Sequence, residues 1–130
     1  MSALANYRVW FFAACAYNAI WGVAIVAFPE RLSRLVGLDV PNAIPLVQVI
    51  GMMVGVYAYG YYLLARDPLR YSGLIWVAIA GKTLGPIGYV WAASSGALPW
   101  SFGWTCLFND VIWWPAFWSF GLRYARTPLR

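Results

Sequence analysis

The stretch GLIWVAIAGKTLGPIGYVWAA, residues 73–93, decides the fold, because Lys82 is the only charged residue in it. An α-helix needs a run of about 20 such residues to cross the hydrocarbon of a bilayer. Three further stretches have the same character, and breaks rich in proline, glycine or charge separate them. The four predicted spans are Tyr7–Phe28, Ala43–Ala65, Gly73–Ala93 and Phe102–Leu122. We therefore predict an all-α membrane protein, a single domain over residues 1–130 that forms a four-transmembrane-helix bundle.

The composition supports this prediction and excludes several classes of function. The chain is 63% hydrophobic and 10% charged, whereas a soluble domain carries about 25% charged residues. The net charge is +5, but the basic residues form no cluster that could bind phosphates, so we expect no nucleic-acid partner. Without histidine and with only Cys15 and Cys106, the usual haem and zinc sites are excluded and we expect no cofactor. The two cysteines are predicted at different depths and should not form a disulfide.

The distribution of arginines predicts how the chain is oriented. Cytoplasmic segments of membrane proteins are richer in lysine and arginine than the segments on the other side. The first and third loops hold only Arg31 and Arg34, while both ends and the second loop hold the remaining arginines. These are Arg8, Arg66, Arg70, Arg123, Arg126 and Arg130. We therefore expect both termini on the cytoplasmic side of a bacterial inner membrane.

The first loop contains a pattern that predicts a short helix lying in the membrane interface. In Glu30–Leu38, the side chains of Leu32, Leu35 and Val36 share one helical face, and the charged side chains lie elsewhere. Gly37 would end this helix. An ordinary amphipathic connector fits the same pattern.

Two ionisable residues fall inside the predicted spans, and such residues are the first place to look for function. From the helical rise, Lys82 lies about 13 Å, Asn18 about 16 Å and Asp110 about 18 Å from the cytoplasmic face. An unpaired charge at this depth would be expensive. We therefore predict a Lys82–Asp110 ion pair near the midplane, with Asn18 or Asn109 as a further hydrogen-bond partner.

Two interpretations of this ion pair are open at this point. Buried polar groups can simply fix which helices are neighbours. Alternatively, the pair forms the polar floor of a ligand cavity, or a relay for protons or substrate.

Small residues predict where helix backbones approach closely. Gly51 and Gly55 form a GxxxG pattern in the second span, and Gly81 and Gly85 form another in the third. We expect these faces to pack within the bundle rather than to form a dimer. Pro86 should kink the third span and free backbone carbonyl groups beside the charged residue.

Aromatic residues follow two helical faces. Tyr59 and Tyr62 share a face with Gly55, and Asp110 shares a face with Trp113. If these faces meet, they enclose an aromatic chamber suited to a lipophilic ligand. Aromatic core packing is the alternative interpretation.

Several motifs resemble a family of small bacterial four-helix membrane proteins that often carry the label "alkyl hydroperoxide reductase". The most specific are GKTLGPIG at 81–88 and NDVIWWP at 109–115, with QVIGMMVGVY at 48–57, ARDP at 65–68 and LPW at 98–100. The first span and FPE at 28–30 look like the start of DoxX-like proteins. The resemblance implies the four-helix fold. The label would imply peroxide chemistry at an accessible thiolate, whereas Cys15 and Cys106 each stand alone in an apolar stretch.

Three classes of function fit the sequence. The first is a non-catalytic membrane protein, either an accessory subunit of a larger complex or a binder of a lipid, quinone or isoprenoid. Its expected partners are membrane lipids and other membrane chains, or further copies of itself. The second is a small transporter or channel that uses Lys82 and Asp110. The third is a membrane enzyme acting on a lipid or quinone, with Asp110 as general acid or base.

Overall fold

The computed structural model describes residues 3–35, 37 and 43–125, and this part of the chain contains helices and no strand. The long helices are α1 (Ala3–Ala27), α3 (Ile44–Arg66) and α4 (Leu74–Ser94). The shorter ones are α2 (Pro29–Leu35), α5 (Gly103–Asn109) and α6 (Trp114–Tyr124), with the 3-10 helices η1 (Trp100–Phe102) and η2 (Val111–Trp113). The predicted all-α fold class is therefore confirmed.

Three helices, α1, α3 and α4, are long and apolar enough to cross a membrane, which indicates a membrane protein. They correspond to the first three predicted spans. The prediction of one continuous helix over Phe102–Leu122 is wrong, because α5 ends at Asn109 and Asp110 leaves helical geometry with φ −123° and ψ −62°. Pro115 lies in the first turn of α6, where its missing N–H costs nothing.

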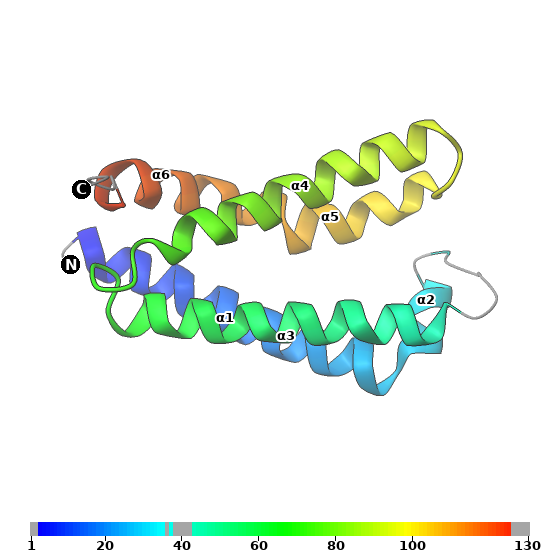
Figure 1. Ribbon diagram of the computed structural model, residues 1–130, viewed down its shortest axis with the longest axis horizontal. Coiled ribbons are helices and arrows are strands. Elements are labelled where there is room, and N and C mark those ends of the chain that lie inside the picture. Colours follow the sequence, from blue (N-terminus) through cyan, green and yellow to red (C-terminus); the bar gives the residue numbers. More distant parts are fainter. Residues whose placement is uncertain (1–2, 36, 38–42, 126–130) are drawn as a thin grey trace.

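The helices form two hairpins that lie against each other (Figure 1). One hairpin consists of α1 and α3, and the other consists of α4 with α5 and α6. The start of α1, the end of α6 and the α3–α4 connection lie at the same end of the molecule, and α2 lies at the opposite end (Figure 1). We call these the terminal end and the distal end.

Glycine contacts bring α1 and α3 together over their length. A Cβ atom added to Gly22 would lie 2.8 Å from the carbonyl oxygen of Gly51 and 2.9 Å from the backbone nitrogen of Gly55. A Cβ atom on Gly51 would in turn lie 2.8 Å from the side chain of Ile25, whereas one on Gly55 would meet nothing within 4 Å, so of the two glycines of the α3 pattern only Gly51 leaves no room for a side chain. The role of Gly22 is not predictable from the sequence, because a single glycine forms no recognisable pattern.

A hydrophobic core fills the terminal end. Its members come from α1, α3, α4, η2 and α6, and from Ala125 directly after α6; we call them the terminal core. They are Tyr7, Phe11, Ala14, Tyr61, Leu64, Ala65, Ile75, Ala78, Ile79, Trp113, Ala116, Phe117, Phe120 and Ala125. At the distal end, by contrast, the buried apolar side chains outside this core include Ile25, Ala93 and Cys106.

The first loop contains the predicted short helix, α2, which ends two residues before Gly37. Gly37 has a positive φ of 76°, a backbone conformation that favours glycine. Leu35 is exposed, Leu32 is half-buried, and Ser33 is buried. Val36, also part of the predicted apolar face, lies outside the described residues.

Candidate functional site

At the centre of the molecule, α4 and the α5–α6 segment each leave a backbone carbonyl group without its usual helical donor. Pro86 has no N–H group, so it cannot donate to the carbonyl oxygen of Lys82, four residues earlier. The indole nitrogen of Trp114 in α6 donates to that oxygen instead, at 3.0 Å. The freed carbonyl group that the sequence predicts near the charge is therefore occupied by a donor from another helix.

A second bond, in the opposite direction, satisfies the carbonyl group left free at the break between α5 and α6. In a continuous α-helix, the backbone nitrogen of Trp113 would donate to the carbonyl oxygen of Asn109. Here it donates to the carbonyl oxygen of Asp110 instead. The ammonium group of Lys82 donates to the carbonyl oxygen of Asn109. The α4 helix and the α5–α6 segment thus each provide a donor for the carbonyl group that the other leaves free.

The ion pair predicted from the sequence is present at this junction. The distance from Nζ of Lys82 to Oδ1 of Asp110 is 3.5 Å, and their side chains are 5% and 10% exposed. Nδ2 of Asn109 donates to the same carboxylate oxygen at 2.9 Å. The ammonium group also lies 5.9 Å from the ring centroid of Tyr61, a distance compatible with a cation–π contact.

Asn18 is close to the pair but does not bond to it. Its Nδ2 atom donates to the carbonyl oxygen of Val54 at 3.4 Å, so of the two partners allowed by the sequence only Asn109 is used. Asn18 nevertheless lines the same cavity as Lys82 and Asp110, in agreement with the similar depth predicted for the three residues.

A cavity of about 350 Å³, which we call the polar pocket, lies beside the ion pair. Residues of both hairpins line it: Asn18, Ile50, Met53, Val54, Tyr57, Gly81, Lys82, Gly85, Asn109 and Asp110. Two glycines of α4 keep it open. A Cβ atom on Gly81 would lie 2.8 Å from the hydroxyl of Tyr57, and one on Gly85 would lie 3.1 Å from Oδ2 of Asp110.

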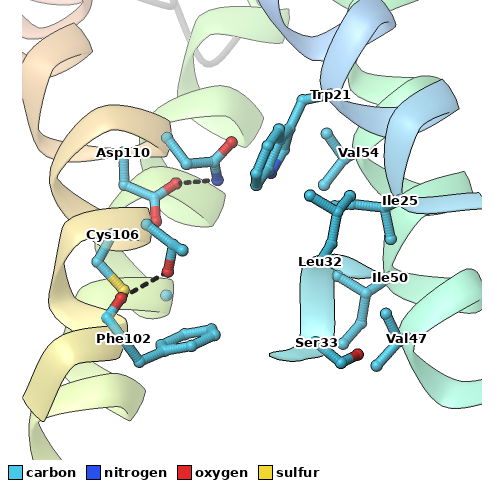
Figure 2. A pocket seen from close by; sticks show the side chains of 13 residues that line it. Trp21, Ile25, Leu32, Ser33, Val47, Ile50, Val54, Phe102, Cys106 and Asp110 are labelled. Atoms are coloured by element: carbon cyan, nitrogen blue, oxygen red, sulfur yellow. Dashed lines mark hydrogen bonds between the residues drawn. The ribbon is translucent and has the colours of Figure 1, made fainter. Parts of the chain in front are cut away.

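A second cavity of about 270 Å³, which we call the cleft, extends from the same junction towards the distal end. Figure 2 shows Trp21, Ile25 and Ile50 on one side of it, facing Asp110 and Cys106 on the other. The remaining lining residues are Leu32, Ser33, Val47, Val54, Gly85, Phe102, Thr105 and Asn109. The cleft and the polar pocket share Ile50, Val54, Gly85, Asn109 and Asp110. The site is therefore mostly apolar at the distal end and charged at the centre.

Three residues that line these cavities each hold a buried polar atom with no hydrogen-bond partner: Oδ1 of Asn18, Oδ1 of Asn109 and Oγ of Ser33. Buried polar atoms are normally bonded, and each exception needs an explanation. The two amide oxygens accept hydrogen bonds, whereas the serine hydroxyl can donate or accept. A bound molecule with a hydroxyl group would supply the missing donor.

Tyr59, predicted to line the interior, is in fact 65% exposed on the outside of α3. Tyr62 is also turned outward and stacks on Tyr59. The inward-facing tyrosines are Tyr57, which packs on Gly81, and Tyr61, which is 1% exposed. Trp113 does lie inside, where its indole nitrogen donates to the carbonyl oxygen of Phe108 at 3.1 Å.

The two cysteines are free thiols. Cys106 is buried in the wall of the cleft, and Cys15 is half-buried in α1. Within residues 3–35, 37 and 43–125, no three histidine, cysteine, aspartate or glutamate side chains come together as metal ligands.

Comparison with family models, curated proteins and solved structures yields no match for this chain. The resemblance to the DoxX-like and "alkyl hydroperoxide reductase" proteins therefore stays a prediction, and the function has to be argued from the site.

Proposed function

We propose that the chain crosses a bacterial inner membrane four times, with both termini in the cytoplasm and α2 in the opposite interface. In this arrangement α5, η2 and α6 together make the fourth crossing. The common location of the two termini and the apolar length of α1, α3 and α4 support it. Irregular backbone inside a membrane is tolerated where it is buried in protein or lines a cavity, and the break at Asp110 lines both cavities.

Within this membrane arrangement, the protein is proposed to be a non-catalytic binder of a lipophilic molecule. The observation that carries this proposal is that the cleft and the polar pocket share Asn109 and Asp110 in their walls, and that lining residues hold buried polar atoms without a hydrogen-bond partner. Ligand sites typically have volumes of about 300–1,000 Å³ and mostly apolar walls with a few placed polar groups. This site has both properties.

The geometry suggests how such a molecule would bind. Its apolar body would lie in the cleft against Trp21 and Ile25, and its polar group would reach the amides of Asn18 and Asn109. A lipid, isoprenoid alcohol or quinol would provide both parts. The Lys82–Asp110 pair would then serve as the charged floor, in addition to joining α4 to the α5–α6 segment within their hairpin.

The test is to extract and identify the lipophilic molecules retained by the purified protein. Ile50→Trp should reduce retention several-fold, because Ile50 lines both cavities. Val56→Trp is the matched control, since Val56 is an exposed residue of the same helix that lines neither cavity. Equal retention by wild type and both variants would rule the binding proposal out.

A second candidate, a small transporter, has one observation in its favour. Membrane transporters place interrupted helices at their substrate sites near the bilayer centre, and α5–α6 is interrupted at the ion pair. A single bundle of this size would have to act as a dimer. Flux in proteoliposomes that is unaffected by Lys82→Ala would reject this candidate.

A further inference from the structure

A separate groove with a different chemistry lies at the terminal end, between α1 and α6. Its volume is about 300 Å³. The residues that line it are Asn6, Tyr7, Trp10, Pro115, Ala116, Ser119 and Arg123. None of them lines the cleft or the polar pocket.

The outer part of this groove offers hydrogen-bond donors and a positive charge. Arg123 is exposed in the last turn of α6, and within the described residues no acidic side chain lies within ion-pair distance of it. Asn6 contributes an exposed amide on α1. The hydroxyl groups of Tyr7 and Ser119 are 2.6 Å apart. One donates to the other, so the accepting hydroxyl still has its own hydrogen to donate.

The inner part of the groove is apolar. Trp10 lies one helical turn from Asn6, and Pro115 and Ala116 lie one turn from Ser119. The groove therefore runs from polar to apolar along both helices, from the helix ends towards the membrane interior. A free inorganic anion would use only the outer part, whereas a phosphodiester attached to acyl chains would use both.

The electrostatic setting favours an anion at this end. Arg8, Arg66 and Arg70 also lie here, and the Oδ1 atom of the nearby acidic residue Asp67 accepts a bond from the backbone of Arg70. Basic pockets between membrane helices at the cytoplasmic side are suited to anionic lipid headgroups.

We propose that the groove between α1 and α6 is a binding site for the headgroup phosphate of an anionic phospholipid. Arg123 pairs with the phosphate, Asn6 and the Tyr7–Ser119 hydroxyl pair donate to its oxygens, and the first acyl carbons follow Trp10 and Ala116. The proposal rests on the membrane location and is independent of the ligand in the cleft.

Native mass spectrometry of the detergent-solubilised full chain tests the site, with dioleoyl phosphatidylglycerol and dioleoyl phosphatidylcholine as probes. We expect Arg123→Gln to weaken phosphatidylglycerol binding about fivefold, the effect of one arginine near an anionic surface, with no change for phosphatidylcholine. Arg70→Gln removes the same charge at the same end but lies outside the groove, so it should have little effect. Asn6→Leu should weaken the same binding at an exposed position that packing does not constrain.

Three outcomes would overturn the proposal. One is an equal loss of phosphatidylglycerol binding with Arg70→Gln and Arg123→Gln, which would indicate general charge attraction. Another is full binding by both Arg123→Gln and Asn6→Leu. The third is displacement of the bound lipid by excess sodium phosphate, which would identify a site for soluble anions.

Discussion

The two ends of the molecule differ in the side chains that lie between the hairpins. At the terminal end, Phe11, Phe117 and Phe120 are fully buried between the hairpins. At the distal end, the wall facing α1 and α3 includes Gly85, Thr105 and Cys106, and the cleft remains. Large aromatic side chains thus close one end, whereas small side chains leave the other open. The difference suggests that the terminal end holds the hairpins together and the distal end receives a ligand.

The ion pair lies where the two ends meet. Lys82 lies over the ring of Tyr61, a member of the terminal core, and also lines the polar pocket. A substitution at this boundary should therefore affect both stability and ligand binding. A substitution in the terminal core should affect mainly stability, and one in the cleft should affect mainly binding.

The largest expected effect is that of Lys82→Met. It leaves the Asp110 carboxylate without its counter-ion and the Asn109 carbonyl oxygen without its donor, so we expect a loss of about 3–5 kcal/mol in the free energy of unfolding. Unfolding in mixed micelles with increasing sodium dodecyl sulfate would measure it. The double variant Lys82→Met/Asp110→Asn should recover part of the loss. A single variant as stable as wild type would show that the pair does not hold α4 against the α5–α6 segment.

Gly22→Ala should have the next largest effect. The added methyl group would lie within 3.0 Å of the α3 backbone, so the hairpin must shift. Overpacking of this kind costs about 1–3 kcal/mol. Gly60→Ala is the control, because a Cβ atom there meets nothing within 4 Å. Equal unfolding free energies of the two variants would contradict the close contact of α1 and α3.

Trp114→Phe tests the hydrogen bond from the indole nitrogen of Trp114 in α6 to the carbonyl oxygen of Lys82 in α4. The variant keeps the aromatic bulk but leaves the carbonyl oxygen of Lys82 without a donor. We expect a loss of about 1 kcal/mol, the typical value of a polar contact between membrane helices. Trp118→Phe is the comparison, since the ring of Trp118 packs edge-on against Trp76. Trp114→Phe should lower the free energy of unfolding more than Trp118→Phe does, and equal losses would contradict the role of the hydrogen bond.

The smallest effect on stability is expected for Gly85→Ala, because the helix propensity gained on replacing glycine, about 1 kcal/mol, offsets part of the cost of the added contact. Its methyl group would lie 3.1 Å from Oδ2 of Asp110 in the wall shared by both cavities. Retention of the lipophilic molecule should fall, while Gly88→Ala, which meets nothing within 4 Å, should leave it unchanged. Unaltered retention in Gly85→Ala would place the ligand elsewhere.

The sequence predicted the elements that are defined by long apolar runs and by scarce charges. The helices α1, α3 and α4 follow from the former, and the Lys82–Asp110 pair follows from the latter, because two buried charges have few possible partners. The break at Asp110 was missed because its signal, Pro115, stands five residues later and was assigned to the interior of the span.

The orientation of α3 about its axis was the other error. In a soluble helix, polar residues mark the outer face. Both faces of a membrane helix can be apolar or aromatic, so nothing in the sequence distinguished Tyr59 from Tyr61. The packing of Gly51 and Gly55 on Gly22 fixes this orientation in the structure, and one sequence does not reveal which glycines meet.

The central claim, that the charged junction is the floor of a ligand site, can be tested at one atom. Lys82 is the only lysine in the chain, so ¹⁵N-lysine labelling gives a single side-chain Nζ signal by solid-state NMR. We predict different Nζ shifts for protein reconstituted with its native membrane extract and for delipidated protein. Ile50→Trp should abolish the difference and Val56→Trp should preserve it. An identical Nζ signal with and without the extract would contradict the account.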